Sequence, residues 1–250
     1  MKKYITAFAM TQSMFCSIPF PFSEWDEDAR PYMLVFLPAV GLEIGVLWFL
    51  CHKILTGISL PQPMYALVMC ILPFLLTGFI HLDGFMDVTD AVMSCRDIEK
   101  RRAILKDSHV GSFAVVWCVI LFMTVFASFL SAENTASAFP LIFIPVISRI
   151  ASALAVTNLA SMSTSQYSKV KSPKSHNIVL IIFMVLSFAL TYIFSGRYVA
   201  CLAVQAVVYG YNLRKNYKSL DGMNGDISGF CITASEAAAV AVWAVLQVTI

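Results

Sequence analysis

Charged residues are scarce in this sequence. Only 13% of its 250 residues are Asp, Glu, Lys or Arg, whereas 59% are hydrophobic and the mean hydropathy is +0.78. Soluble globular domains are typically about 45 to 50% apolar, so this composition excludes an ordinary soluble protein and predicts a membrane protein. The net charge of +2 is too small to indicate a nucleic-acid partner, and we expect none.

Several motifs of known chemistry are also missing. The seven cysteines form no C-x-x-C pair and no His stands at zinc-finger spacing, so we interpret them as small buried hydrophobic residues. There is no glycine-rich nucleotide loop, no G-x-S-x-G, no H-E-x-x-H and no kinase signature. No Pro/Gly/Ser-rich linker and no internal repeat divides the chain, so we expect one integral membrane domain over residues 1–250.

Long apolar runs are abundant, and about 20 mainly apolar residues are needed for a helix to cross a bilayer. They predict an all-α, polytopic membrane bundle of about seven transmembrane helices: Tyr32–Cys51, Met64–Ile80, Ser112–Leu130, Phe139–Thr157, Asn177–Ser195, Tyr198–Leu213 and Gly229–Val248. The segment that starts with Met1-Lys2-Lys3 has polar interruptions and no small-residue cleavage site. We interpret it as an uncleaved amphipathic or interfacial segment, and a dip into the bilayer is the alternative.

Positive residues between the predicted spans are distributed unevenly. With the N-terminus in the cytoplasm, one side collects most of the loop cations: Lys2, Lys3, Arg30, Arg96, Lys100, Arg101, Arg102, Lys106, Lys169, Lys171, Lys174, Arg214, Lys215 and Lys218. The other side receives only Lys53 and Arg197. Because cytoplasmic loops are enriched in Lys and Arg, this partition predicts a multi-pass protein of the cell (inner) membrane with its C-terminus outside.

A row of carboxylates follows the second predicted span, in the pattern H-x-D-G-x-x-D-x-x-D from His81 to Asp90. On a helix, Asp83, Asp87 and Asp90 are spaced by three or four residues and share one face. Three carboxylates so close repel one another, and oxygen-only ligation favours Mg²⁺ or Mn²⁺ over zinc. The alternative is a solvated acidic helix end, but hydrophobic residues surround each acid and no lysine stands at i+4.

Two further polar clusters are predicted on the same side. The segment K-D-S-H-V-G at residues 106–111 offers Asp107 for a metal and Lys106 and Ser108 for phosphate, or it is an ordinary polar cap before a helix. The segment L-D-G-M-N-G-D at residues 220–226 predicts tight turns through its Asp-Gly and Asn-Gly pairs. We expect a cytoplasmic active-site loop over residues 81–111.

Three charges lie inside predicted spans, where a charged side chain usually faces the protein interior. Arg149 is a candidate phosphate contact, Glu236 is a candidate metal ligand or a partner for Arg149, and Glu43 has no assigned role. Carboxylates, a few cations and glycine turns are the groups that metal-assisted phosphoryl transfer needs. The sequence therefore predicts that chemistry at the cytoplasmic membrane face.

The pattern from His81 to Asp90, followed by K-D-S at residues 106–108, closely resembles the signature of the adenosylcobinamide-GDP ribazoletransferase (cobalamin 5'-phosphate synthase) family. Agreement runs nearly end to end, through S-I-P-F-P at 17–21, P-A-V-G at 38–41, P-V-I-S-R at 145–149 and G-D-I-S-G at 225–229. The resemblance implies a Mg²⁺-dependent integral membrane enzyme. It would join adenosylcobinamide-GDP to α-ribazole, or to its 5'-phosphate, giving adenosylcobalamin, or its 5'-phosphate, and GMP.

The resemblance also implies roles for individual residues. Metal ligands would be Asp83, Asp87, Asp107 and Asp226, and the candidate base is Asp90 or His81. Substrate contacts would come from Lys106, Ser108, Arg149, Asn224 and Gly225. The implied partners are the corrinoid nucleotide, α-ribazole and the lipid bilayer, and a homo-oligomer or docking with other corrinoid-pathway enzymes stays open.

One residue and one turn depart from the family pattern. His109 stands where Arg is expected, and the turn at 221–224 has Asp and Asn where Gly and Thr are more usual.

Two other functions are alternatives to that of this family. A CDP-alcohol-type membrane phosphotransferase also has aspartates around D-G, but its pattern continues with Ala-Arg and more widely spaced acids. A cation-coupled transporter would place its acids at the membrane midplane, whereas these gather at one face.

Overall fold

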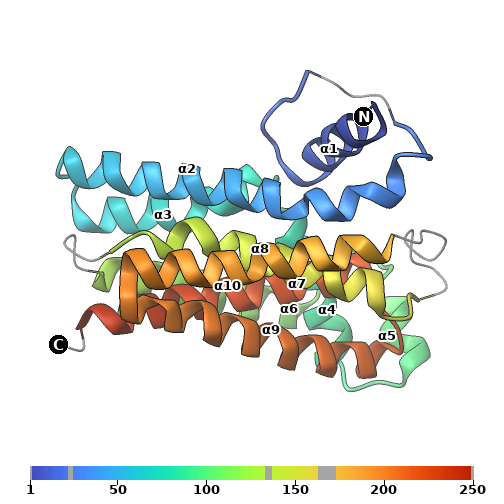
Figure 1. Ribbon diagram of the computed structural model, residues 1–250. Coiled ribbons are helices and arrows are strands. Elements are labelled where there is room, and N and C mark those ends of the chain that lie inside the picture. The colour runs from blue at the N-terminus through green and yellow to red at the C-terminus, as the bar shows by residue number, and fades with distance from the viewer. Residues whose placement is uncertain (1, 22–24, 133–136, 163–172, 249–250) are drawn as a thin grey trace.

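The computed structural model describes residues 2–21, 25–132, 137–162 and 173–248, and these residues form an all-helical bundle (Figure 1). Two of the predicted cytoplasmic cations, Lys169 and Lys171, lie outside the described residues. The described elements are α1 (Lys2–Phe15), η1 (Arg30–Phe36), α2 (Leu37–Gly57), α3 (Gln62–Leu76), α4 (Ile80–Met93), α5 (Ile98–Ile104), α6 (Ser112–Ser131), α7 (Pro140–Asn158), α8 (Lys174–Ser195), η2 (Gly196–Tyr198), α9 (Val199–Leu220) and α10 (Gly225–Val248).

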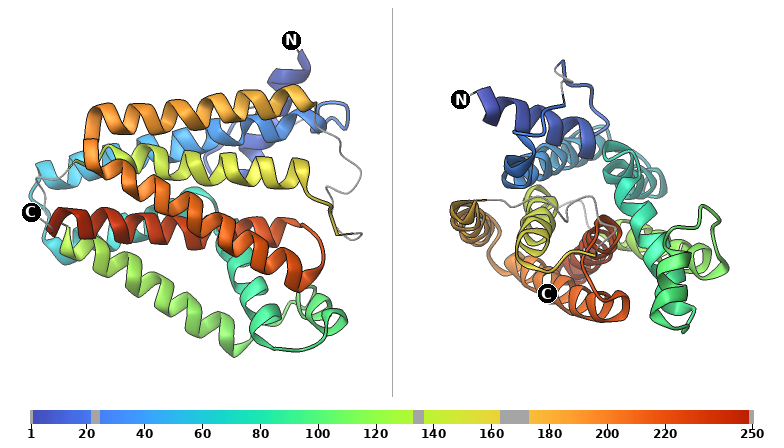
Figure 2. Two further views of the ribbon diagram at one scale, coloured as in Figure 1. Left: turned by 60° about the horizontal axis from the view of Figure 1, so that its bottom comes forward. Right: turned by 90° about the vertical axis from the view of Figure 1, so that its right-hand side faces the viewer.

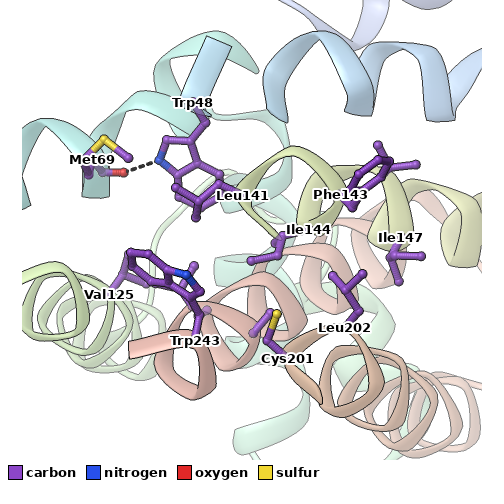
Figure 3. Packing of buried hydrophobic residues seen from close by; sticks show 14 of the residues in the cluster. Trp48, Met69, Val125, Leu141, Phe143, Ile144, Ile147, Cys201, Leu202 and Trp243 are labelled. Atoms are coloured by element: carbon purple, nitrogen blue, oxygen red, sulfur yellow. Dashed lines mark hydrogen bonds between the residues drawn. The ribbon is translucent and has the colours of Figure 1, made fainter. Parts of the chain in front are cut away.

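The long helices run side by side, and α7 and α10 occupy the middle of the bundle (Figures 1 and 2). α7 packs against α2, α8, α9 and α10, whereas α10 packs against α4, α6, α7 and α9. Trp48, Leu141, Ile144 and Trp243 pack between these helices, as Figure 3 shows. The Trp48 indole N–H donates to the Met69 carbonyl at 2.9 Å, so this polar group is satisfied inside the apolar core.

Five of the described helical segments are long and apolar enough to cross a membrane, or six if α3 and α4 form one bent span, against the expected number of about seven. Part of the difference arises because Ser175–Leu220 is one continuous helical segment of 46 residues, whereas the sequence predicted two spans in this region. The chain reverses at η2, after Gly196 with φ +52°, and α8 and α9 run back along each other (Figure 2, left). These two helices correspond to two of the predicted spans.

The second predicted span is shorter than expected because the helix breaks before Ile80. Gly78 and Phe79 have φ values of +57° and +63°, and α4 leaves α3 at an angle of 91°. The carbonyl groups freed at the end of α3 are bonded by Ser17, whose hydroxyl and N–H donate to Leu75 and Leu76. The segment that follows α1 therefore fixes the position at which α4 begins.

One end of the bundle, which we call the charged end, holds α4, α5, the starts of α6 and α10 and the end of α9 (Figures 1 and 2). The segment between α4 and α6 and the end of α9, which carry cations predicted on one side of the membrane, come together here. The end of α2, which carries Lys53, and η2, which carries Arg197, lie at the opposite end. α1 lies across the bundle beside η1 and α2, with Ala7 and Met10 packed on Met33 (Figure 2, right). The interfacial position of the N-terminal segment stays a prediction.

Candidate active site

Two glycines allow α4 and the start of α10 to approach within backbone contact. A Cβ atom on Gly84 would lie 2.9 Å from the Asp226 Cα, and one on Gly229 would lie 3.0 Å from the His81 carbonyl oxygen. The same carbonyl oxygen accepts a hydrogen bond from the Thr233 hydroxyl at 3.1 Å. Because larger residues would separate the helices, these glycines place the carboxylates of α4 beside Asp226.

Asp83, Asp87 and Asp226 form the acidic group at this contact, and each is close enough to another for their charges to interact. Asp83 is exposed, whereas Asp87 and Asp226 are partly buried. Within the described residues, no salt bridge joins any of the three to a Lys or Arg side chain. Like charges held together at reduced hydration favour the arrival of a cation.

The described side chains do not form a finished metal cage. Among them, no group of three or more His, Cys, Asp or Glu residues is arranged to hold a metal ion. The four acids predicted as metal ligands are also divided by the fold. Asp83, Asp87 and Asp226 lie together, whereas Asp107 lies in the exposed loop before α6 and is turned toward His109.

Asn224, predicted as a substrate contact, instead caps α10 and orients Asp226. Its side-chain oxygen accepts from the Ile227 N–H at 2.9 Å, and its amide nitrogen donates to Asp226 Oδ2 at 2.6 Å. The neighbouring Gly225 is exposed and is the first residue of α10. Since Asn is a common N-cap residue, the departure from the usual turn sequence has a structural explanation here.

A cavity of about 120 Å³ lies against the acidic group. Asp83 and Asp226 line it together with His81, and Met14 and Phe15 from the end of α1 close part of the wall. Its remaining lining residues are Leu34, Leu37, Ile80, Ser152, Val156, Gly225, Ser228, Gly229 and Ile232. The cavity thus combines carboxylates, an imidazole and hydroxyl groups beside apolar side chains, which suits the binding of a ligand with polar and apolar parts.

His81 is a buried member of this cavity, with 8% of its surface exposed. Its ring stacks on Phe15 with centroids 6.3 Å apart, and its Nδ1 atom has no hydrogen-bond partner. Buried polar atoms are normally paired in folded proteins. The imidazole thus lines the cavity while one of its nitrogens has no protein partner.

Asp90, the other candidate base, serves as a cap for α6. Its two carboxylate oxygens accept hydrogen bonds from the N–H groups of Gly111 and Ala114, at 2.7 and 2.9 Å. A Cβ atom on Gly111 would lie 2.5 Å from the carboxylate, so only glycine fits there. Because both oxygens are engaged at a helix N-terminus, Asp90 is held as a structural group.

The K-D-S-H segment is exposed and lies apart from the cavity. Asp107 Oδ1 is 2.6 Å from the His109 Nδ1 and also accepts from the His109 N–H. These hydrogen bonds lower the pKa of the Asp107 carboxyl and raise the pKa of the His109 imidazole. Lys106 and Ser108 are exposed beside them, and Lys106 forms no salt bridge within the described residues.

Arg149, predicted as a phosphate contact, forms an ion pair with Glu236, the alternative considered from the sequence. The side chain is 1% exposed, and its Nη1 lies 2.6 Å from Glu236 Oε1. The same glutamate oxygen accepts from the Ser148 hydroxyl at 2.5 Å. The third intramembrane charge, Glu43, accepts from the Gln12 side chain at 2.5 Å. Each of the three intramembrane charges is therefore bonded to another part of the protein.

Ser152 and Ser228 are cavity residues that sequence reasoning did not assign. Their hydroxyl groups are hydrogen-bonded to each other between α7 and α10. The sequence could have indicated both positions as site residues, because Ser152 lies one helical turn after Arg149 and Ser228 lies within the G-D-I-S-G motif. Only the packing of α7 against α10 shows that they meet.

Comparisons with known proteins agree with one another. A model of the family described as cobalamin-5-phosphate synthase matches residues 7–244. A Clostridium perfringens protein named adenosylcobinamide-GDP ribazoletransferase is 36% identical over 241 residues, covering 94% of this chain and 96% of that relative. Proteins of the same name from Clostridium botulinum and Lachnoclostridium phytofermentans are 35% and 28% identical, covering 94% of this chain and 96% and 91% of their own lengths. No solved structure matches the chain.

Proposed function

The chain belongs to the cobalamin-5-phosphate synthase family, and we propose that it joins adenosylcobinamide-GDP to α-ribazole, or to α-ribazole 5'-phosphate. A ribose hydroxyl of the ribazole attacks the phosphorus that carries the cobinamide arm. The bond from that phosphorus to the guanylate breaks, so that GMP leaves and adenosylcobalamin, or its 5'-phosphate, is formed. The observation that supports this site most strongly is the cavity between α1, α4, α7 and α10, which carries Asp83 and Asp226 and an unpaired His81 nitrogen.

Mg²⁺ is the metal that we propose for this site, although its ligands need side-chain movement to complete the coordination. The donor chemistry fits, because Asp83, Asp87 and Asp226 offer only oxygen atoms and have no Lys or Arg in a salt bridge with them among the described residues. Bound Mg²⁺ would neutralise charge on the phosphate oxygens. Asn224 holds one oxygen of Asp226, which fixes the direction in which the other oxygen points.

Within this proposal, His81 accepts the proton of the attacking hydroxyl. It lines the cavity and carries the free Nδ1, whereas both oxygens of Asp90 are engaged with the backbone of α6. Phe15 stacks on the imidazole and limits access of water from the side of α1. Lys106 and Ser108, in the exposed loop, are the side chains that we propose to contact substrate phosphate from outside the cavity.

We further propose that the charged end faces the cytoplasm from the cell (inner) membrane, because cytoplasmic loops are enriched in Lys and Arg. The site would then meet its nucleotide substrates in the compartment where they are made. The proposed partners are the corrinoid nucleotide, the ribazole and the surrounding bilayer. Self-association and docking with other corrinoid-pathway enzymes stay predictions that no contact in the described residues addresses.

The test is GMP release by the purified, detergent-solubilised protein given adenosylcobinamide-GDP, α-ribazole and Mg²⁺. We expect Asp83→Asn to lower the rate at least about a hundredfold, the scale on which an electrostatic catalytic contact acts, and EDTA to do the same. The matched control is Asp97→Asn, because Asp97 is an exposed N-cap of α5 at the same end and asparagine retains that function. The control should release GMP at the unmodified rate.

Three outcomes are informative. GMP and a cobalamin product that need both Asp83 and metal would support the site and the substrate together. Turnover of CDP-alcohol substrates in place of the corrinoid nucleotide would keep the chemistry and reject the substrate. An Asp83→Asn variant that turns over normally with Mg²⁺ would reject the proposed metal site while leaving the family reaction intact.

A further inference from the structure

A second cavity, which we call the lateral groove, lies on the far side of α4 from the acidic group. It has a volume of about 350 Å³ and is bounded by α4, α6, α9 and α10. Phe85, Trp117, Leu121 and Phe230 contribute apolar walls from three of these helices. None of the residues lining this groove lines the active-site cavity, so the two are separate.

The lateral groove faces the side of the bundle, where the bilayer would lie. α6 and α9 both pack on α10, and the groove is lined by residues of all three helices and of α4. Trp117 and Ile120, on the groove side of α6, are 40% and 45% exposed. An apolar groove open toward lipid is suited to an acyl chain, which enters sideways without crossing water.

One end of the groove is polar and carries a buried amide donor without a partner beside an exposed lysine. Asn216 is 2% exposed, and its amide nitrogen has no acceptor. Lys215 lines the same end and forms no salt bridge within the described residues. A buried amide donor without a partner carries a desolvation cost that an incoming acceptor would remove.

The polar end lies near the end of α9, where lipid headgroups would lie in the proposed orientation. Lys215 and Asn216 stand about one helical turn before the end of α9 at Leu220, and Arg214 and Lys218 flank them. These residues belong to the charged end, where the positive loops meet the membrane surface. A phosphate held by Lys215 and Asn216 would therefore place its attached chain along the apolar walls of the groove.

We propose that the lateral groove binds an anionic phospholipid, with its phosphate at Lys215 and Asn216 and one acyl chain between α6 and α9. Inorganic phosphate would leave the apolar walls uncovered, and a neutral lipid would leave the cation without a partner. The site has a consequence for catalysis. Phe85 and Val92 stand on the side of α4 opposite Asp83, so a bound chain supports the helix that carries the acidic group.

The experiment uses the full chain in nanodiscs and follows quenching of tryptophan fluorescence by lipids with brominated acyl chains. We expect brominated phosphatidylglycerol to quench Trp117 more strongly than phosphatidylcholine with the same chains. Trp117→Phe identifies the signal by difference, because Trp48 and Trp243 are buried in the core and the exposed Trp25 is present in both proteins. Lys215→Gln should lower the preference for phosphatidylglycerol about fivefold, because the groove loses one direct contact to the phosphate worth about 1 kcal/mol. Lys218→Gln, on the same helix and outside the groove, is the matched control.

A second pair of variants tests the groove by volume. Thr124→Phe fills the groove from α6 and should abolish the preferential quenching, whereas Met123→Phe adds an equal ring on the exposed face and should not. Equal quenching by the two lipids, or a preference that survives both Lys215→Gln and Thr124→Phe, would overturn the proposal. So would quenching that is independent of headgroup and is removed by α-ribazole 5'-phosphate, which would assign the groove to that nucleotide. GMP release is not the readout, so this result is independent of the proposed reaction.

Discussion

At the scale of single residues, hydrogen bonds separate the carboxylates into structural and available groups. Asp90 accepts two backbone hydrogen bonds at the start of α6, and Glu236 accepts from Arg149 and Ser148. Both acids are thereby held at reduced hydration by positive or dipolar partners. Asp83 has no such partner among the described residues, which leaves its oxygens free for a ligand.

The capping role of Asp90 predicts a stability effect. Asp90→Ala should lower the free energy of unfolding by about 1 to 2 kcal/mol, because two N–H groups at the start of α6 lose their acceptor. The free energy of unfolding of Asp90→Asn should lie between that of Asp90→Ala and that of the unmodified protein, since one side-chain oxygen remains. The measurement is reversible unfolding in detergent followed by circular dichroism.

Glu99→Ala is the control for this experiment, because Glu99 is exposed at the same end and forms no salt bridge in the described residues. Its unfolding should match that of the unmodified protein. Equal stabilities of Asp90→Ala and Glu99→Ala would contradict the capping role.

At the scale of elements, small helices and helix ends hold the site in place. α5 is docked on the C-terminus of α9, where Arg101 donates to the Ser219 carbonyl and Arg102 to the carbonyls of Leu220 and Asp221. Cations suit the negative end of a helix and satisfy its last carbonyl groups. The basic run of the sequence therefore fixes the turn that leads into α10 and Asp226.

The contact between α4 and α10 predicts a strong effect of a single methyl group. Gly84→Ala would place a Cβ atom 2.9 Å from both the Cα and the carbonyl oxygen of Asp226. Because backbone cannot move aside cheaply, we expect a loss of about 1 to 3 kcal/mol in stability and slower GMP release. Unfolding and turnover should be measured on the same preparation.

Gly210→Ala is the matched control for the helix contact. Gly210 lies within α9, and a Cβ atom there would meet nothing within 4 Å. Alanine in a helix interior should raise stability by roughly 0.5 to 1 kcal/mol over glycine, with turnover unchanged. If both alanine variants behave alike, the close approach of α4 and α10 does not position the site.

At the scale of the whole molecule, the chain gathers its polar chemistry at one end of an apolar bundle. The acidic group, α5 and the basic end of α9 all lie at the charged end, and the short loop between α2 and α3 lies opposite (Figures 1 and 2). Such asymmetry gives the protein a direction in the membrane.

That direction can be measured with one native cysteine and one introduced cysteine. Cys95 is exposed at the charged end, and Ser59 is exposed in the loop between α2 and α3, each at a positive φ of 52°. In intact cells, a membrane-impermeant maleimide should label Ser59→Cys and leave Cys95 unlabelled until the membrane is opened. A Cys95→Ser variant shows which signal belongs to the native thiol. Labelling of Cys95 from outside would reverse the proposed orientation.

Much of the fold followed from the sequence because bilayer crossing depends on local composition. The apolar runs predicted the long helices, and the distribution of Lys and Arg predicted which loops lie together, as the structure shows. The break after Leu76 was not predicted, because the span was assigned on apolar length although Thr77 and Gly78 interrupt the run. Ser17, nearly 60 residues earlier, bonds the carbonyl groups that the break leaves at the end of α3.

The sequence by itself determined the chemistry of the site: oxygen ligands, an imidazole and cations at one end of a membrane protein, in the pattern of a known family. Only the tertiary structure decided which of these groups are free. Asp90 is engaged 24 residues along the chain at Ala114, Arg149 is paired with Glu236 across 87 residues, and Asp226 is brought to Gly84 by helix packing. A residue's type fixes what it can bind, but its partner is fixed by contacts between segments far apart in the chain, which local pattern does not encode.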